Sequence, residues 1–247
     1  SSQLSDSTLS SISLVGLRSI KDEEELALIK RAIEISDKAF EFMLDNLHEG
    51  MREIEAAALL EYEMRRLGSE GISFPTIVAS GTRSALPHGI ASSKVIERGD
   101  FVTFDFGAIY SGYHSDITRT LVIGNASSWQ RELYELVREA QLLGIKNARA
   151  GITGAELDAI VRSFITSHGY GQYFGHGLGH GVGLDIHELP VASRRGKEKL
   201  ESNMVVTVEP GIYIPGKGGV RIEDVIVIAP DGCNVLTNAS KRLFEIN

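Results

Sequence analysis

Two stretches decide the fold: FVTFDFG at residues 101–107 and VVTVEPG at residues 205–211. Each is a run of strand-forming residues that ends in an acid and a glycine. The two stretches lie 104 positions apart, and the acids that follow them, Asp116 and Glu223, lie 107 positions apart. Three residues that precede the first stretch have identical counterparts 101 positions later: Gly50, Glu55 and Gly68 recur as Gly151, Glu156 and Gly169. Chance similarity between short hydrophobic strands is the alternative. The coincidence of acids as well as apolar residues favours an internally duplicated fold with pseudo-twofold symmetry.

Local patterns predict helices and strands in separate runs. A helix is expected from Asp22, which forms a capping-box pattern with Glu25, and another from Thr153 with Glu156, ending near residue 169. Further helices are predicted at 53–67 and 128–148, and strands at 101–106, 115–123, 204–208 and 221–228. This order is typical of an α+β fold. Residues 1–21 are interpreted as a serine-rich tail or linker remnant, and residues 22–247 as one domain.

Four acids stand out because each lies in a strongly hydrophobic or glycine-rich stretch: Asp105, Asp116, Glu209 and Glu223. Charged side chains are almost never buried unless they are paired or bind a metal. Asp105 and Asp116 flank a turn-rich connector, so their strands can form a hairpin, in which facing side chains lie about 5 Å apart. Glu223 is expected to share a strand face with Arg221, whereas Asp224 faces the other way and is expected to make a structural hydrogen bond or salt bridge.

The histidines are clustered in a run of alternating glycines at residues 175–183, which contains His176 and His180. The glycines exclude a stable helix, but in an extended chain this spacing still places both rings on one face. His88 and His187 are further candidates, whereas the remaining histidines are assigned to helix ends or surface turns. Four carboxylates that converge on His180 would repel one another without cations. The sequence therefore predicts a two-metal hydrolytic centre.

Composition excludes several other classes of protein. The 247 residues are 43% hydrophobic and carry a net charge of −8, which argues against nucleic acid or an anionic membrane as the main partner. One cysteine, Cys233, excludes a disulfide framework and favours a reducing compartment, so a cytoplasmic location is expected. No apolar run is long enough for a membrane span, and no secretory leader is evident. The first residue is not methionine, which suggests a processed protein or a fragment.

Five motifs in order resemble the pita-bread metallopeptidases, and more narrowly their Xaa-Pro dipeptidase (prolidase) and Xaa-Pro aminopeptidase (aminopeptidase P) branch. They are Asp-Phe-Gly at 105–107, Ser-Asp-Ile-Thr-Arg-Thr at 115–120, the His-Gly run, Glu-Pro-Gly-Ile-Tyr at 209–213 and Arg-Ile-Glu-Asp at 221–224. The resemblance covers about residues 15 to 247. It implies a duplicated α+β pita-bread domain, with a curved antiparallel sheet covered by helices, and two divalent metal ions.

The resemblance also implies roles for individual residues. Asp105 would chelate one metal, Asp116 and Glu223 would bridge both, and His180 with Glu209 would hold the other. His88, His176 and His187 would line the substrate and oxyanion side, Arg221 would support the site from beside Glu223 and bind substrate, and Glu209 would also shuttle the proton. A metal-bridging hydroxide would attack the X-Pro peptide bond. With oxygen ligands dominating, manganese is favoured over cobalt, iron or zinc.

Two alternatives remain. Methionine aminopeptidase is a close relative of similar size, but Pro87-His88-Gly89 and residues 183–188 are typical of the proline-specific branch. A catalytically inactive pita-bread binding module would have lost metal ligands, whereas all five are present here. Members of the Xaa-Pro branch usually carry an additional N-terminal domain, of which this sequence shows only the serine-rich stretch. Dipeptides and longer X-Pro peptides both remain open as substrates, as does a homodimer.

Overall fold

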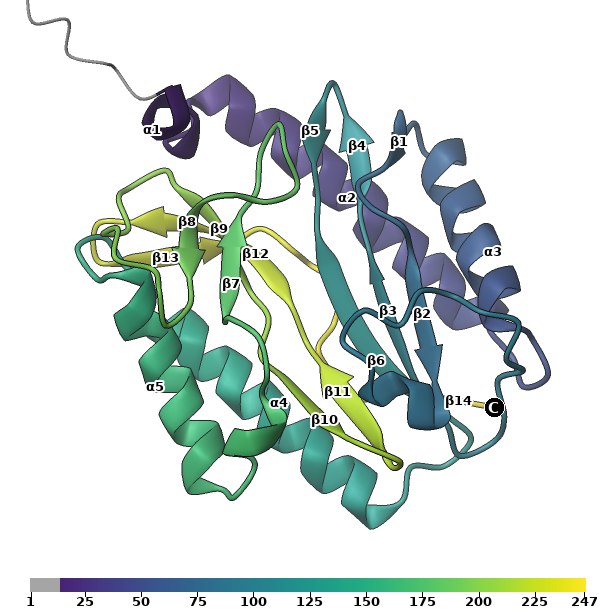
Figure 1. Ribbon diagram of the computed structural model, residues 1–247. Helices are drawn as coiled ribbons and strands as arrows, with labels where there is room; N and C mark the ends of the chain where they lie inside the picture. The colour runs from purple at the N-terminus through teal and green to yellow at the C-terminus, as the bar shows by residue number, and fades with distance from the viewer. Residues whose placement is uncertain (1–13) are drawn as a thin grey trace, which may run out of the picture.

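The computed structural model describes residues 14–247, and its helices flank strands in two successive groups (Figure 1). The helices are α1 (Leu14–Ser19), α2 (Glu23–Asn46), α3 (Glu53–Arg66), α4 (Ser128–Asn147) and α5 (Gly154–Ser167), with short 3-10 turns η1 (Gly81–Ala85) and η2 (Gly171–Tyr173). The strands of the first half are β1 (Gly71–Ile72), β2 (Ile77–Ser80), β3 (Phe101–Phe106), β4 (Ala108–Tyr110), β5 (Tyr113–His114) and β6 (Ile117–Ile123). Those of the second half are β7 (Gly179–Gly181), β8 (Glu188–Ala192), β9 (Val205–Val208), β10 (Gly211–Ile214), β11 (Gly218–Arg221), β12 (Asp224–Ala229), β13 (Gly232–Val235) and β14 (Glu245–Ile246).

The same order of elements occurs twice, as the sequence predicted. Two helices (α2 and α3, then α4 and α5) precede a flanking strand (β2 beside β3, then β7 beside β9) and a central antiparallel pair, β3 with β6 and then β9 with β12. Within residues 14–247 the strands form four sheets, and the larger two have the orders β14-β6-β3-β2 and β13-β12-β9-β7-β8. Pairing is antiparallel except for β14, which lies parallel to β6. The α+β class and the predominantly antiparallel arrangement are confirmed.

Each half has its own apolar core. In the first half, α2 and α3 pack on β2, β3 and β6 through residues such as Phe40, Leu60 and Phe104, all at most 1% exposed. In the second half, α4 and α5 pack on β9 and β12 through residues such as Val137 and Val161. Because the helices cover the outer side of the strands, the acids at the strand ends face the junction between the halves.

The predicted helix caps are present. The side chain of Asp22 accepts from the backbone N–H of Glu25 at 2.8 Å, and the Glu25 carboxylate accepts from the backbone N–H of Asp22 at 2.9 Å. Thr153 and Glu156 make the same reciprocal pair at the start of α5. Gly68, just after α3, has a φ of +104°, which favours glycine at a helix C-terminus. These local signals therefore placed the helix boundaries to within one or two residues.

Two predicted strands differ in the structure. The strand expected at 221–228 is two strands, β11 and β12, and Glu223 lies in the break between them rather than on a strand face with Arg221. The break arises because the backbone N–H of Glu223 donates to Thr118 O in the other half, at 3.1 Å. The strand expected at 115–123 begins at Ile117, so Asp116 immediately precedes it.

Part of the predicted tail is folded onto the domain. Ile20 forms an isolated antiparallel bridge with Met204, and the side chain of Lys21 is 1% exposed. Arg18 also donates to Asp185 and Glu188, so residues 18–21 contact the domain, and residues 1–13 of the predicted tail lie outside the described residues. None of the helices within residues 14–247 has the length and apolarity to cross a membrane.

Candidate metal centre

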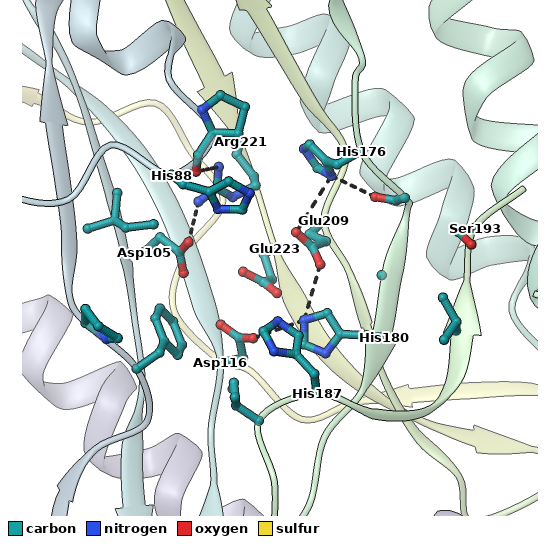
Figure 2. Close-up of a pocket in the computed structure, with 18 of the residues that line it drawn as sticks. His88, Asp105, Asp116, His176, His180, His187, Ser193, Glu209, Arg221 and Glu223 are labelled. Atoms are coloured by element: carbon teal, nitrogen blue, oxygen red, sulfur yellow. Dashed lines mark hydrogen bonds and ion pairs between the residues drawn. The ribbon is translucent and has the colours of Figure 1, made fainter. Parts of the chain in front are cut away.

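A cleft of about 450 Å³ lies at the junction of the halves and contains every site residue that the sequence predicted (Figure 2). The predicted residues that line it are His88, Asp105, Asp116, His176, His180, His187, Glu209, Arg221 and Glu223. Its remaining walls include Phe74, Pro75, Ile77, Pro87 and Ile90 from the first half, and Ile186, Val191 and Ser193 from the second. The cleft is thus a cluster of charged groups between two apolar walls.

The acids reach the cleft from the ends of the central strands. Asp105 is the penultimate residue of β3 and pairs with Thr118 of β6. Glu209 immediately follows β9, where Pro210 ends the strand. The two hairpins differ in register, because Val208 pairs with Asp224, the residue next to Glu223. As a result, the acids of the second hairpin lie opposite each other, whereas Asp105 is displaced by two residues from the position opposite Asp116.

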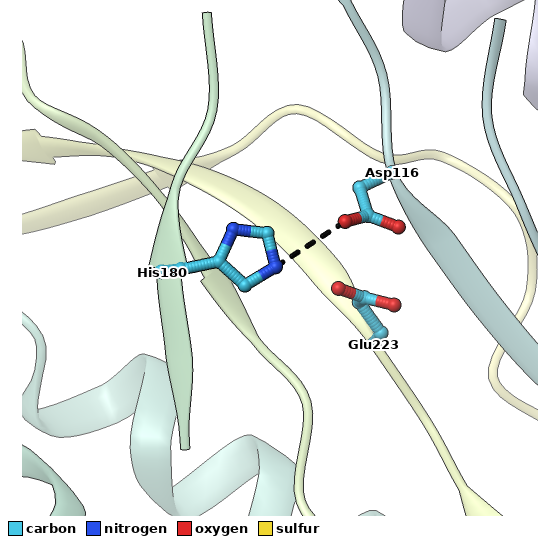
Figure 3. Close-up of side chains that lie close together, drawn as sticks. All are labelled: Asp116, His180 and Glu223. Atoms are coloured by element: carbon cyan, nitrogen blue, oxygen red, sulfur yellow. Dashed lines mark ion pairs between the residues drawn. The ribbon is translucent and has the colours of Figure 1, made fainter. Parts of the chain in front are cut away.

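Asp116, His180 and Glu223 form the tightest group, with one ligand atom of each within 4.8 Å of the others (Figure 3). The Nε2 atom of His180 lies 3.4 Å from Asp116 Oδ2 and 3.4 Å from Glu209 Oε1. Its Nδ1 atom lies 3.0 Å from the carbonyl oxygen of Gly181. Since a carbonyl only accepts, Nδ1 carries the proton in the neutral ring, and the lone pair of Nε2 then faces two carboxylates. This arrangement is repulsive unless a proton or a cation lies between these groups.

The pKa values of this group express the same repulsion. Burial and the neighbouring carboxylates raise the pKa of Asp105 to about 6 and that of Glu209 to about 7, although Arg221 and His180 oppose both shifts. Burial raises the pKa of Glu223 further, well above its usual range. Burial opposes the charged form of His180, but the Asp116 and Glu209 carboxylates still raise its pKa to about 9. Each shift lowers the negative charge of the cluster, because its buried carboxylates repel one another.

Glu223 shows a further unsatisfied atom. Its Oε2 accepts from the hydroxyl of Thr118 at 2.6 Å, whereas Oε1 is buried and has no hydrogen-bond partner among the residues that the structure describes. A buried carboxylate oxygen without a partner is costly and calls for a ligand. The donor set, with four carboxylates and an imidazole whose other nitrogen donates to a backbone carbonyl, fits divalent metal ions.

Asp105 differs from the other acids because it is ion-paired. Its Oδ2 accepts a hydrogen bond from Nη2 of Arg221, which is 3% exposed. Arg221 also donates from Nε to Thr118 at 3.0 Å, and from Nη1 to the hydroxyl of Tyr213 at 2.7 Å and to Pro87 O at 3.2 Å. These contacts agree with the expected supporting role of Arg221, and its contact with substrate stays a prediction.

His176 is held by a chain of hydrogen bonds on the same side of the cleft. Its Nδ1 lies 2.7 Å from Gly177 O and its Nε2 lies 2.8 Å from the hydroxyl of Tyr213. Burial and the positive charge of Arg221 lower the pKa of His176 to about 4, so the ring is neutral near pH 7. Nδ1 must therefore donate to the carbonyl, and Tyr213 must donate to Nε2 while it accepts from Arg221.

His88 and His187 lie at the open rim, one from each half. Both side chains are exposed, and the His187 ring lies 4.3 Å from the ring of His180, centroid to centroid. Burial and the nearby His180 lower the pKa of His187, which keeps that ring neutral. The two rings therefore flank the acidic cluster without belonging to it.

Three polar residues that support the site were not identified from the sequence. Thr118 donates to Glu223, Thr207 donates to Glu209 Oε1 at 3.2 Å and accepts from the backbone N–H of His180 at 3.0 Å, and Tyr213 joins His176 to Arg221. Thr118 and Thr207 each lie two residues from a site acid, and side chains at this spacing share one face of a strand. This spacing could have identified both threonines from the sequence. By contrast, the structural role expected of Asp224 is confirmed, since it pairs with Arg119 at 2.7 Å and with Lys241.

Comparison with known proteins assigns the family. Residues 27–230 match the model of metallopeptidase family M24. The chain is 52% identical over 228 residues to a protein named Xaa-Pro dipeptidase from Pyrococcus horikoshii, a match that covers 92% of the chain and 65% of that protein. The chain belongs to metallopeptidase family M24.

Solved structures agree with this assignment. A structure named Xaa-Pro dipeptidase from Bacillus anthracis superimposes with a TM-score of 0.93 at 53% identity, covering 94% of this chain and 65% of that one. An X-Pro aminopeptidase from Thermotoga maritima gives a TM-score of 0.93 at 51% identity, covering 94% and 66%. The pita-bread fold that the sequence predicted is confirmed. The chain spans about two thirds of the length of these relatives, and their names describe those longer proteins.

Proposed function

We propose that this chain is the catalytic domain of a dinuclear-metal peptidase that hydrolyses the peptide bond before proline, as an Xaa-Pro dipeptidase or Xaa-Pro aminopeptidase. The observation that carries the proposal is the convergence of His180 Nε2 with two carboxylates, each 3.4 Å away, in a cleft with two further acids. The names of the relatives support the substrate class.

The metal ligands in this proposal are the five residues expected from the sequence: Asp105, Asp116, His180, Glu209 and Glu223. Bound divalent ions would polarise the scissile carbonyl and provide an activated water near neutral pH. The predominance of oxygen donors favours manganese over the softer ions. Asp116 and Glu223 belong to the tight group with His180, which supports their assignment as the ligands shared by both ions.

The chain's own side chains would handle the substrate and the protons. Glu209 Oε2 lies 4.0 Å from His176 Nδ1 and lines the cleft, where it can carry a proton to the leaving nitrogen. The exposed rings of His88 and His187 can donate hydrogen bonds to the oxyanion that forms as the carbonyl is attacked. The apolar wall formed by Phe74, Pro75, Ile77 and Ile90 provides a surface for a proline ring.

A panel of four peptides tests the proposal on metal-free protein supplied with Mn²⁺ or Co²⁺. The panel contains an X-Pro dipeptide, a longer X-Pro peptide, the dipeptide with alanine in place of proline, and a Met-Ala peptide. We expect metal-dependent cleavage of at least one X-Pro substrate and little cleavage of the alanine analogue. The ratio of dipeptide to longer-peptide cleavage separates dipeptidase from aminopeptidase. Efficient methionine release would instead establish a methionine aminopeptidase, and the absence of both metal binding and hydrolysis would favour an inactive binding module.

A further inference from the structure

A buried carboxylate outside the metal centre, Glu53, holds both ends of the loop that carries His88. Glu53 is the first residue of α3 and is 0% exposed. The His88 loop, residues 81–91, leaves β2 at Ser80 and returns to the domain at Ser92, and three of its residues line the cleft (Pro87, His88 and Ile90). Glu53 lies where the two ends of this loop meet.

The carboxylate accepts hydrogen bonds from both ends of the loop. Its Oε1 accepts from the backbone N–H of Ser80 at 2.7 Å and from the Ser80 hydroxyl at 2.9 Å. Its Oε2 accepts from the backbone N–H of Ser92 at 3.1 Å and from the Ser92 hydroxyl at 2.6 Å. Arg83, inside the loop, donates from Nε to Oε2 at 3.0 Å and from Nη2 to Ile90 O at 2.7 Å. A single side chain thus connects the start, the middle and the end of the loop.

Gly89 packs closely on Ala79, but the apolar side chains on either side of His88 are not buried. Leu86 is 48% exposed and Ile90 is 58% exposed, and His88 between them is also exposed. The loop has other polar anchors, such as Ser84, which accepts from Gly219 N at 2.9 Å, but these lie before His88. After His88, Ile90 forms an isolated antiparallel bridge with Ile77, and Ser92 O accepts from the backbone N–H of Ile54 at 2.9 Å. The side-chain anchor of this part of the loop is the contact of Ser92 and Arg83 with Glu53.

The second half shows that a carboxylate is not needed at this helix terminus for the fold itself. The offset of 101 residues places Gly154 at the position of Glu53. There the backbone packs directly on the start of α5, since a Cβ on Gly154 would lie 2.0 Å from Val191 O and Ala155 N donates to Gly196 O at 2.8 Å. Only the first half places a side chain with two acceptor oxygens between the helix and the chain that crosses it.

We propose that Glu53 is a positioning residue that sets the location of the His88 ring over the metal centre, by fixing both ends of the His88 loop. It does not touch substrate, and its effect on turnover would pass through His88 (labelled in Figure 2). The effect on turnover rests on the proposed peptidase function, whereas the effect on the loop does not. Misplacing a group by about 1 Å can cost on the order of 100-fold in rate.

The variant Glu53→Gln tests the proposal, because the amide nitrogen of glutamine cannot accept from one of the two serine pairs. The matched control is Glu63→Gln, since Glu63 is also a buried acid of α3 (3% exposed) but pairs with Arg66 at the surface. We expect amide hydrogen exchange in residues 80–92 to become faster in Glu53→Gln and to stay unchanged in residues 182–188. The control should leave exchange in both segments unchanged.

Turnover of an X-Pro peptide gives the second readout. We expect kcat to fall by about 10- to 100-fold with the metal content unchanged. On a His88→Ala background the same substitution should cause no further fall, because residues that act through one group are not additive. The proposal is overturned if the double variant loses kcat by the product of the two single-variant losses. It is also overturned if Glu53→Gln loses metal. Unchanged exchange in residues 80–92 would overturn it as well.

Two outcomes need an additional experiment: a Glu53→Gln variant that does not fold, and an unmodified protein that shows no hydrolysis. If Glu53→Gln does not fold, Ser92→Ala replaces it: this variant removes the hydroxyl that donates to Glu53 and accepts from the backbone N–H of Lys94. Faster exchange in residues 86–92 supports the proposal, and unchanged exchange overturns it. If the unmodified protein hydrolyses no X-Pro peptide, the proposed function fails, and the exchange experiment still tests the role of Glu53 on the loop.

Discussion

Divalent metal should stabilise this protein, because bound cations would offset the repulsion between buried carboxylates in the cleft. Asp116 and Glu223 are only 4% and 2% exposed, so their repulsion is present in the folded chain and weak in the unfolded one. An ion that binds only the folded state adds about 2.7 kcal/mol at 100 times its dissociation constant. For a domain of this size each kcal/mol raises Tm by roughly 2 to 4 °C. One bound ion should therefore raise Tm by about 5 to 11 °C, and two ions by about twice as much.

The assay is thermal unfolding of chelator-treated protein during a titration with Mn²⁺, together with metal stoichiometry after dialysis. Asp116→Asn should abolish most of the metal-dependent rise, since Asp116 lies in the tight group with His180 and Glu223. Glu209→Gln should abolish turnover but keep about half of the rise, because Glu209 contacts only the His180 side of that group. Glu63→Gln should behave as the unmodified protein does, since Glu63 does not line the cleft and pairs with Arg66. Equal metal loss in Asp116→Asn and Glu209→Gln would refute the assignment of shared and unshared ligands, and no rise with Mn²⁺ or Co²⁺ would refute the metal centre.

Three further outcomes are expected. His187→Ala should lower kcat while both metals stay bound, and metal analysis that shows an ion lost would make His187 a ligand. Thr118→Val should lower the free energy of unfolding by about 1 to 3 kcal/mol for each partner left unsatisfied, Glu223 Oε2 and Arg221 Nε, as read from urea titrations. Lys21→Met should lower it on the order of 3 kcal/mol at pH 7, because Lys21 Nζ lies 3.0 Å from Glu188 Oε2 and the side chains are 1% and 6% exposed. Although burial opposes it, the Asp185 N–H, Lys21 and Arg18 hold the pKa of Glu188 below 4.5, so this contribution is present above about pH 4.5 and is lost as the pH falls through the folded-state pKa. The gap between Lys21→Met and the unmodified protein should therefore narrow in acid, and a gap independent of pH would contradict the pairing.

The sequence predicted those parts of the fold that depend on neighbouring residues. The caps at Asp22 and Thr153 are local hydrogen bonds between residues three apart, so the sequence shows them directly. The acids at the ends of β3 and β9 were recognisable because a charge that ends an apolar strand has few structural explanations. Both kinds of signal come from a short stretch of chain.

Features that depend on distant residues could not be predicted in this way. The strand break at Glu223 arises from a hydrogen bond to Thr118, 105 positions earlier. Lys21 was assigned to a tail because its partner, Glu188, is 167 positions away. Glu53 is similar to any acid in the first turn of a helix, and only the folded structure brings Ser80 and Ser92 to its two oxygens.

The duplication itself explains how two similar halves build one asymmetric site. Ser80 pairs with Val102 on β3 and Gly181 pairs with Val206 on β9, so Ala79 on β2 and His180 on β7 hold equivalent positions. In the first half the His88 loop folds back over this position, since a Cβ on Gly89 would lie 2.9 Å from the Cβ of Ala79. A large side chain at 79 would displace that loop, whereas in the second half the equivalent side chain is the imidazole that faces the acids. This strand position therefore has a different role in each half. In the first half Ala79 supports the loop that brings His88 to the rim, and in the second half the position itself carries His180. Since the acids recur in both halves while these histidines do not, the acids would hold the two cations of the proposed centre, and the unpaired histidines account for the difference between the two sides of the cleft.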